Sequence, residues 1–424
     1  MNHMQYKMGE CMMTLQETPC TTDTTLSLLL EVCCRSAGMM IENGGETYRA
    51  EESVSFLCAH FGAKVGVAVL STTLFVQIEL DGQTVQAVRR LDKRTLNLDC
   101  LAQVNEIVRN ICAGSITLDE AQEKLKNVRK NGPYHSLIHV ICFCVAAAAA
   151  VFVYGGGWYD LLPAFLCGLV YPCMPDRWKD RVASQMIVYC ASGAVIALVA
   201  MLSYLISPLV NPVAIVAASA ISLYPGAAFV NAIRDTMHGD LVSGVARLCE
   251  ALLKVGMLAA GAAVVFGLWT NGLVGQPVQF ISLPWIGHFI AGFFVVICLA
   301  IEQCTPPKTI IVCGIIGAFS YIVCKFMVGC VPFMPAAYFV GALVMSVSCE
   351  WMARKMKLPA TVFLVSAIMV LVPGKGLFDS MLYLASGMYS LLAKSGADTL
   401  VQMIAMSMAI ALSTFCSRSI SAKK

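Results

Sequence analysis

The chain has 424 residues, of which 58% are hydrophobic and only 13% are charged, and its mean hydropathy is +0.74. Soluble globular proteins carry about 25% charged residues, so the composition excludes an ordinary soluble protein and predicts that lipid surrounds most of the chain. No block of Lys and Arg interleaved with aromatic residues occurs, and we therefore expect no nucleic-acid partner.

Charge divides the chain into two parts. Residues 1–130 hold 13 Lys/Arg and 16 Asp/Glu, whereas the remainder holds 16 Lys/Arg and 10 Asp/Glu. We expect a tail (1–23), a cytoplasmic α/β domain (24–130), a first membrane repeat (131–275) and a second membrane repeat with the C-terminal tail (276–424). Because no basic start precedes an apolar core at the N-terminus, no signal peptide is predicted.

The 20 cysteines suggest neither a disulfide framework nor a metal site. No C-x-x-C spacing occurs, and most cysteines lie at or after Cys142 within apolar segments, where Cys behaves as a small hydrophobic residue. No G-x-x-x-x-G-K-[ST] phosphate-binding loop is present either. We therefore expect no metal and no cofactor.

The first domain reads as two helices, three strands and two further helices. Asn43-Gly44-Gly45 interrupts the first helical segment. The strands are expected at 65–70, 73–80 and 84–91, with a hairpin turn at Asp81-Gly82. Helices should follow at 98–113 and 117–130, the second starting with a capping box formed by Thr117 and Glu120.

Acidic residues cluster after the glycine turn. Glu46 and Arg49 are three positions apart, a spacing typical of a modest surface ion pair. Glu51 and Glu52 follow directly. Catalytic carboxylates are the alternative, but no His, Ser or Cys is placed to assist them.

Ten apolar segments follow the first domain. They are 137–154, 158–174, 182–206, 212–224, 241–268, 281–301, 309–324, 331–349, 360–372 and 396–416. With the N-terminal domain inside, eleven Lys/Arg lie in inward connections and three, Lys325, Lys375 and Lys394, in outward ones. The positive-inside rule therefore predicts ten spans with both termini in the cytoplasm.

Two of these segments are too short to cross a bilayer. Residues 212–224 and 360–372 are 13 residues each, or about 20 Å of helix, against a hydrocarbon core of about 30 Å. They run into Pro225-Gly226 and Pro373-Gly374, which are 148 positions apart. Short, interrupted segments at matching places in two halves are typical of a transporter's binding site.

Five spans per half is an odd number, so two such halves in one chain must be oppositely oriented. The sequence thus predicts a mainly α membrane protein with a five-plus-five inverted repeat and broken helices. The first Pro-Gly would face the cytoplasm and the second would face outward. Asp379 lies 148 positions after Asn231, so polar residues occupy equivalent places.

Ionisable residues in apolar surroundings are candidates for transport. Arg234 and Asp235 could form a structural pair at the membrane surface or contact a solute, and Arg247 with Glu250 presents the same two alternatives. Asp379 could carry a coupling proton or lie among headgroups. The candidate pathway residues are Pro225, Gly226, Asn231, Arg234, Asp235, Asp240, Arg247, Glu250, Pro373, Gly374 and Asp379.

Two segments resemble the threonine/serine exporter family. The first motif is matched by Gly44, Gly45, Glu46, Tyr48, Arg49, Glu51 and Glu52, and the second by Pro225, Gly226, Phe229, Asn231, Arg234, Asp235, Gly239, Asp240, Ser243, Gly244, Arg247, Glu250 and Ala251. The resemblance covers nearly the whole chain. It implies a cytoplasmic α/β domain before ten spans, and export driven by an ion gradient without nucleotide hydrolysis.

The expected function is secondary-active export of threonine, serine or a similar solute across a bacterial inner membrane by alternating access. An Arg would bind the carboxylate of the solute, and an acid would bind its amine or a proton. The partners expected are this solute, protons or another coupling ion, and lipid; a homo-oligomer is left open. The alternatives are dicarboxylate (succinate) export and a membrane-anchored hydrolase that uses the N-terminal acids.

Overall fold

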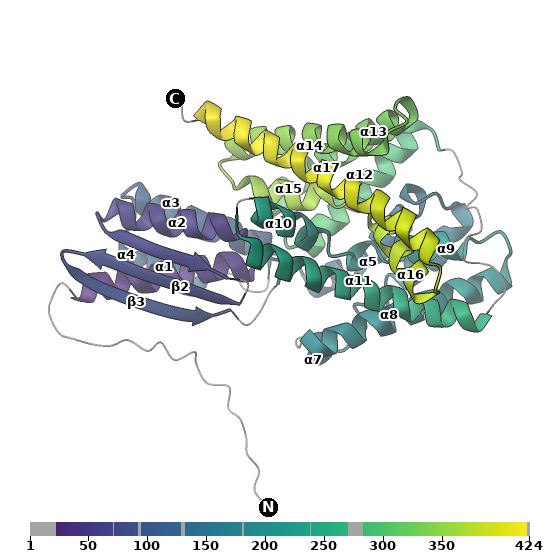
Figure 1. The fold of residues 1–424 in the computed structure, drawn as a ribbon, viewed down its shortest axis with the longest axis horizontal. Helices are drawn as coiled ribbons and strands as arrows, with labels where there is room; N and C mark the ends of the chain where they lie inside the picture. Colours follow the sequence, from purple (N-terminus) through teal and green to yellow (C-terminus); the bar gives the residue numbers. More distant parts are fainter. Residues whose placement is uncertain are drawn as a thin grey trace, which may run out of the picture. The chain divides into compact units, whose positions relative to one another are not determined.

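The structure is a computed structural model that describes residues 23–70, 72–91, 95–128, 132–179, 182–237, 239–269 and 283–421. All but the last residue of the expected tail 1–23 lies outside these ranges. The chain divides into two compact units, residues 1–94 with 103–128 and residues 95–102 with 129–424. Figure 1 labels the helices and strands of both units, which are described separately below.

The first unit combines helices with a small antiparallel sheet of order β1-β2-β3. Three residues of β2, Leu74, Val76 and Ile78, alternate along the strand and are buried, and α1 packs against β2 and β3. The period of two thus turns one face of the strand toward the helices. The elements are α1 (Asp23–Glu42), α2 (Thr47–His60), β1 (Lys64–Val69), β2 (Thr73–Leu80), β3 (Gln83–Arg90), α3 (Leu98–Cys112) and α4 (Leu118–Asn127).

Local signals in this unit are confirmed. Leu80 pairs with Gln83 across the hairpin, and the turn residues Asp81 and Gly82 have φ values of 51° and 79°. Both are left-handed, as a two-residue hairpin turn requires. The capping box is present, with the Glu120 amide donating to Thr117 Oγ1 at 3.3 Å and the Thr117 amide to the Glu120 carboxylate at 3.1 Å.

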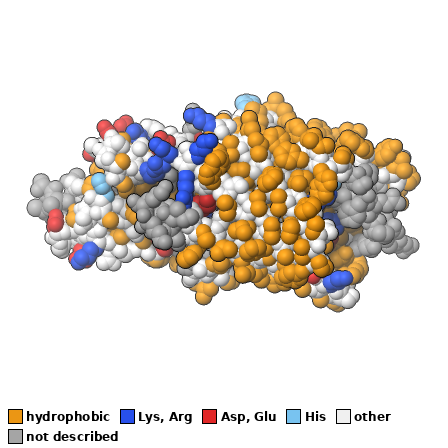
Figure 2. Space-filling view, turned by 90° about the horizontal axis from the view of Figure 1, so that it is seen from above, with side chains coloured by type: hydrophobic (Ala, Val, Ile, Leu, Met, Phe, Trp, Pro, Cys, Tyr) orange, Lys and Arg blue, Asp and Glu red, His pale blue; other side chains and the backbone are white. Residues whose placement is uncertain are grey.

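The second unit is helical and carries a lipid-compatible surface. Among the described residues, seven helices are long and apolar enough to cross a membrane. Figure 2 shows hydrophobic side chains covering much of the visible surface of these helices, and exposed large residues on them include Ile187, Leu198, Phe319, Trp351 and Phe415. The long helices are α5 (Ser136–Val153), α8 (Val182–Ile206), α11 (Leu241–Trp269), α12 (Trp285–Glu302), α13 (Ile310–Cys330), α14 (Met334–Met356) and α17 (Tyr389–Ser421).

The three other predicted spans form shorter helices. A bend of 58° separates the segment 212–223 from α10, and this pair would make an eighth span if counted as one. Ten spans therefore remain a prediction. The short elements are η1 (Trp158–Asp160), α6 (Leu161–Cys167), α7 (Asp176–Lys179), α9 (Pro212–Ser219), η2 (Ile221–Leu223), α10 (Gly226–Met237), η3 (Pro307–Thr309), α15 (Ala360–Ile368) and α16 (Gly374–Ala385).

Helix packing follows the same scheme in the two halves. In the first half α8 packs on α11, α5 on α6, and α8 on α9; in the second half α14 packs on α17, α12 on α13, and α14 on α15. Between the halves, α11 contacts α16, α10 contacts α17, and α5 contacts α12. Each helix therefore meets the neighbours that its counterpart in the other half meets.

Two glycines bring α8 and α11 close together. A Cβ on Gly193 would overlap the backbone carbonyl of Leu258, and one on Gly261 would overlap that of Cys190. Small residues let membrane helices approach until their backbones touch. This contact supports α11, which follows α10 in the chain.

Candidate functional site

The two Pro-Gly breaks have the same local geometry. In each, a 12-residue helix starts at the glycine, as α10 at Gly226 and α16 at Gly374. The Gly226 amide donates to the Tyr224 carbonyl at 2.8 Å, and the Gly374 amide donates to the Val372 carbonyl at 2.7 Å. Proline lacks an amide proton and disfavours helix in the residue before it. Each helix is therefore interrupted at the position that the sequence marks.

The breaks also contact each other reciprocally. A Cβ on Gly226 would lie 3.2 Å from Val372 Cγ2, and a Cβ on Gly374 would overlap the ring of Tyr224. Positions 224 and 372, like 226 and 374, are 148 apart. Each glycine therefore packs against the residue two positions before the other glycine, and the contact leaves no room for a side chain at Gly374.

A cavity of about 610 Å³ lies beside the second break. Its walls come from α13, α14, α16, α17 and the end of α5. This volume falls in the range of small-molecule sites. The charged and aromatic residues that line it are Lys325, Lys375, Lys394, Asp379, Asp398, Tyr154, Tyr321, Tyr338 and Tyr383.

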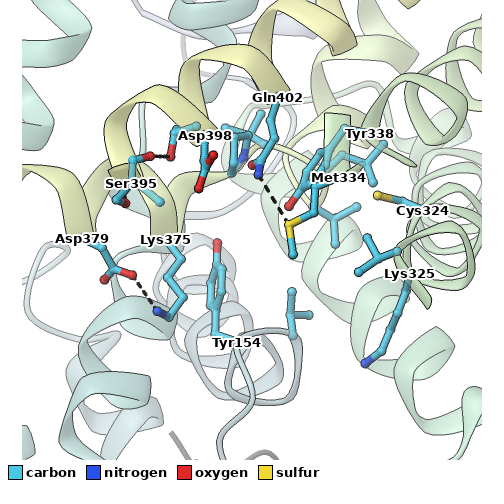
Figure 3. Close-up of a pocket in the computed structure, with 18 of the residues that line it drawn as sticks. Tyr154, Cys324, Lys325, Met334, Tyr338, Lys375, Asp379, Ser395, Asp398 and Gln402 are labelled. Carbon is cyan, nitrogen blue, oxygen red and sulfur yellow. Dashed lines mark hydrogen bonds and ion pairs between the residues drawn. The ribbon is translucent and has the colours of Figure 1, made fainter. Parts of the chain in front are cut away.

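Charges in this cavity lie on separate walls. Lys375 Nζ is 2.7 Å from Asp379 Oδ2, four residues further along α16. Figure 3 shows this pair on one side of the cavity and Lys325 on the other, with Tyr154 between them. Lys394 and Asp398 are exposed on α17. All three lysines that the sequence assigns to outward connections thus line a single cavity.

Around the first break the helices are closely packed. Phe229 belongs to a buried cluster with Val255, Leu377 and Met403. A space of about 10 Å³ lies between α10 and the second break and is lined by Val230, Ile233, Val372, Pro373, Met403, Met406 and Ser407. Such a volume holds about one water molecule. The second break therefore separates this almost closed space, on the side of α10, from the solute-sized cavity.

The buried charges of the first half lie on both sides of the turn between α10 and α11. Arg247 Nε is 3.3 Å from Asp235 Oδ2, and these side chains are 8% and 0% exposed. Asn231 and Arg234 are also buried on α10. The sequence pointed to these residues but did not indicate that Asp235 would meet Arg247, twelve positions later.

Two further candidates have local partners. The Asp240 carboxylate accepts a hydrogen bond from the Ser243 amide at 3.2 Å, as an acid does at a helix start. Glu250 Oε1 lies 2.8 Å from Lys254 Nζ, one helical turn away on α11. Asp240 therefore caps the N-terminus of α11, while Glu250 takes part in an i,i+4 ion pair.

The acidic motif of the first unit surrounds the start of α2. Arg49 lies 3.9 Å from Glu46, so the ion pair that the spacing predicts is present, but the Glu46 carboxylate is buried and not at the surface as expected. Glu51 Oε1 accepts a hydrogen bond from the Val69 amide at 3.0 Å and thereby ties α2 to the end of β1. Tyr48 and Glu52 are half-buried.

Sequence reasoning missed two polar contacts in the membrane unit. Lys325 Nζ lies 2.6 Å from Nε2 and 3.1 Å from Nδ1 of His288 on α12. The Ser222 hydroxyl in η2 donates a hydrogen bond to Glu302 Oε1 at 3.0 Å. His288 and Glu302, as ionisable residues within or next to the apolar run 281–301, were the available signal.

Apolar helices, paired helix breaks and a cavity lined in part by charged residues are typical of an integral membrane protein of the transporter class. Family models support this assignment: the threonine/serine exporter model ThrE matches residues 31–269, and a second model, "Threonine/Serine exporter, ThrE", matches residues 288–416. The chain belongs to the threonine/serine exporter family.

Curated relatives agree with the family. The chain is 23% identical to a "Probable threonine/serine exporter" of Mycobacterium tuberculosis over 82% of this chain and 69% of that protein. It is 20% identical to the threonine/serine exporter of Corynebacterium glutamicum over 85% and 76% of the two chains. The "Probable succinate transporter subunit YjjP" of Klebsiella aerogenes is 24% identical over 56% of this chain and 93% of its own length. No solved structure matches.

Proposed function

We propose that this protein exports threonine, serine or a similar small amino acid across a bacterial inner membrane by alternating access. The observation that carries the proposal is the pair of Pro-Gly breaks that contact each other reciprocally, with a cavity of about 610 Å³ beside the second. Paired broken segments from two halves, next to a solute-sized cavity, are the elements that alternating access uses. A hydrolase is not proposed, because the family is one of exporters.

The proposed topology is ten spans in a five-plus-five inverted repeat, with both termini in the cytoplasm. A reciprocal contact, in which position i meets j and the equivalent of j meets the equivalent of i, is the signature of a two-fold axis. The contacts of Gly226 with Val372 and of Gly374 with Tyr224 have this form. In this orientation the cavity of the second half opens outward and the first break closes the cytoplasmic side.

Asp379 is the proposed coupling residue. It faces the cavity and already binds one ammonium group, that of Lys375, at 2.7 Å. The amine of a bound amino acid and a proton would compete for the same carboxylate. Competition of this kind couples export of the solute to entry of a proton, because each ligand lowers the affinity for the other.

The buried polar residues at the first break are proposed to serve the solute when the cytoplasmic side opens. Asn231 lies 148 positions before Asp379, and Glu250 lies 148 positions before Asp398. Arg234 and Arg247 would then supply positive charge for the carboxylate of the solute, with Asp235 and Asp240 nearby in the chain.

Transport in proteoliposomes tests the proposal. An imposed proton gradient should drive labelled threonine through the wild-type protein, and Asp379→Asn should abolish this drive while leaving threonine exchange between the two sides measurable. Asp119→Asn, which changes an exposed acid on α4, is the matched control. Undiminished gradient-driven flux in Asp379→Asn would exclude Asp379 as the coupling residue.

Dicarboxylate export is the second candidate. The cavity holds three lysines against two aspartates, and relatives of the first half are named as succinate transporter subunits. An excess of cations favours a solute with two carboxylates over a zwitterion. Competition between unlabelled succinate and labelled threonine in the same vesicles separates the two candidates, since the solute that displaces the other at lower concentration is the preferred one.

A further inference from the structure

The contact between Lys325 and His288 has no role in the function proposed above. His288 is 5% exposed on α12, and Lys325 is half-buried on α13, where it lines the cavity. The ammonium nitrogen lies 2.6 Å and 3.1 Å from the two ring nitrogens. Two cations would repel each other at this distance, so attraction requires that one partner be neutral. The pair therefore carries a single positive charge.

The charge on this pair is not balanced by an acid. Among the described residues, no carboxylate lies within 4.0 Å of Lys325. Lys375, on the opposite side of the cavity, forms an ion pair with Asp379. An ammonium has three donor hydrogens, and one imidazole can accept only one of them. Lys325 thus presents unused donors to a cavity in a low-dielectric surrounding, where an unpaired charge is costly.

We propose that Lys325 forms a carboxylate-binding subsite of the cavity, and that the buried imidazole of His288, which contacts the same ammonium group, takes up a proton when the carboxylate binds. The inference rests on the proposed function, because it assumes that the cavity receives the transported solute. A carboxylate can accept a charge-assisted hydrogen bond from the ammonium. Its negative charge removes the repulsion that keeps the unoccupied pair at one positive charge.

Other titratable groups surround the same space and bear on its charge. Tyr321 lies next to His288, with ring centroids 6.4 Å apart. The remaining groups that face the cavity are Tyr154 from α5, Cys324 from α13, Tyr338 from α14, Lys375, Asp379 and Tyr383 from α16, and Lys394 and Asp398 from α17. Lys375 is paired with Asp379, so Lys325 and the exposed Lys394 are the cations of the lining that a carboxylate can neutralise, and Lys325 is the more buried of the two.

Calorimetry of the purified full-length protein in detergent tests the subsite. Succinate and threonine are the probes, each titrated in two buffers of different ionisation enthalpy, so that proton uptake is measured together with affinity. Lys325→Gln should weaken binding of the probe about 10-fold to 100-fold, the range of a charge-assisted hydrogen bond. Lys325→Arg, which keeps the charge, should restore most of the affinity.

His288→Gln should bind the probe within a few-fold of wild type but without proton uptake. The wild-type affinity should fall as the pH rises from about 6 to about 8, because the imidazole then no longer accepts the proton. In His288→Gln that dependence should be absent. A merely structural role of His288 would not remove proton uptake while leaving binding in place.

Lys308→Gln is the matched control, because Lys308 is exposed and does not line the cavity. The subsite is refuted if Lys325→Gln binds as tightly as wild type, or if Lys308→Gln loses as much affinity. Wild-type protein that binds neither probe would instead contradict the proposed function. Retained binding by Lys325→Arg excludes misfolding as the cause of a loss in Lys325→Gln.

Discussion

At the scale of single residues, the buried pair of Asp235 and Arg247 shows how charge is held inside the membrane unit. The side chains are 0% and 8% exposed and lie 3.3 Å apart. Removing two charges from water costs several kcal/mol per ion, which their mutual attraction offsets only in good geometry. The pair joins α10 to α11 and thus connects the first break to the long helix that follows it.

Asp235→Asn should destabilise the protein by about 3–5 kcal/mol, because it leaves Arg247 charged and buried without its carboxylate. Thermal unfolding of the purified protein in detergent measures the loss. Asp235→Asn combined with Arg247→Met should recover much of the stability, since neither charge is then buried. If the double variant is no more stable than the single one, loss of the Asp235 charge beside the buried Arg247 guanidinium is not the cause of the destabilisation.

Cys34 provides a prediction on pH in the first unit. Burial raises the pKa of its thiol from 9.0 to about 11, although nearby Arg89 acts in the opposite direction. Between these two pH values the Cys34 thiol loses its proton in the unfolded chain but keeps it in the folded chain. The contribution of Cys34 to the free energy of unfolding is therefore complete below about pH 9. It declines by at most about 1.4 kcal/mol per pH unit up to about pH 11.

Thermal unfolding from about pH 8 to about pH 11 should therefore show a steeper loss of stability in wild type than in Cys34→Ala. Cys416→Ala, which changes an exposed cysteine of the other unit, should behave like wild type. Identical pH profiles for wild type and Cys34→Ala would show that this thiol does not contribute.

At the scale of elements, the sequence predicted local geometry well. The hairpin at Asp81-Gly82, the capping box of Thr117 and the helix breaks at the two Pro-Gly pairs depend on residues adjacent in the chain. Backbone torsions of glycine and the missing proline amide act over a few residues, so no knowledge of packing is needed. Helix length is likewise set locally, and both α10 and α16 have 12 residues.

The contact between the breaks leads to a prediction on Gly374. Gly374→Ala should reduce transport more than Gly226→Ala, because its Cβ overlaps the Tyr224 ring, whereas the Cβ at 226 meets the flexible thioether of Met369 at 2.7 Å. The Tyr224 ring is fixed, since its hydroxyl donates to the Ala217 carbonyl at 3.2 Å. Overpacking of this kind costs about 1–3 kcal/mol.

Flux in proteoliposomes and the unfolding temperature check this prediction together. Tyr224→Ala combined with Gly374→Ala should restore the stability that Gly374→Ala loses, because the space for the methyl group is then free. If Gly374→Ala and Gly226→Ala reduce flux and unfolding temperature equally, the contact of Gly374 with the Tyr224 ring is not the tighter of the two.

At the scale of the whole molecule, the two halves are separable in sequence but joined in packing. The family models divide between residues 269 and 288, and the YjjP relatives correspond to 56% of this chain. Yet the cavity takes Val153 and Tyr154 from the first half and its remaining lining from the second. Each half alone therefore lacks part of the site.

Co-expression of residues 1–275 with residues 276–424 should restore transport, whereas neither piece alone should show it. The helix contacts of α11 with α16 and of α5 with α12 would hold the pieces together. Co-purification of one tagged piece with the other, followed by a flux assay, measures this. Transport by residues 1–275 alone would contradict the two-half site.

The sequence could not predict which charges meet. Lys325, Lys375 and Lys394 come from three different helices, and only the packing of α13, α16 and α17 brings them to one cavity. Arg247 reaches Asp235, and His288 reaches Lys325 across 37 positions. Side-chain contacts at such separations depend on helix rotation and crossing, which hydropathy and spacing do not specify.

The sequence by itself determined that this is an integral membrane protein, that its helices break at two Pro-Gly pairs, and that it belongs with the exporters whose motifs it carries. Composition and local backbone chemistry suffice for these conclusions. The tertiary structure alone decided that the two breaks touch and that a solute-sized cavity adjoins the second of them. The physical reason is that contacts and cavity volume are set by how distant helices pack, which the local geometry of a helix break does not specify.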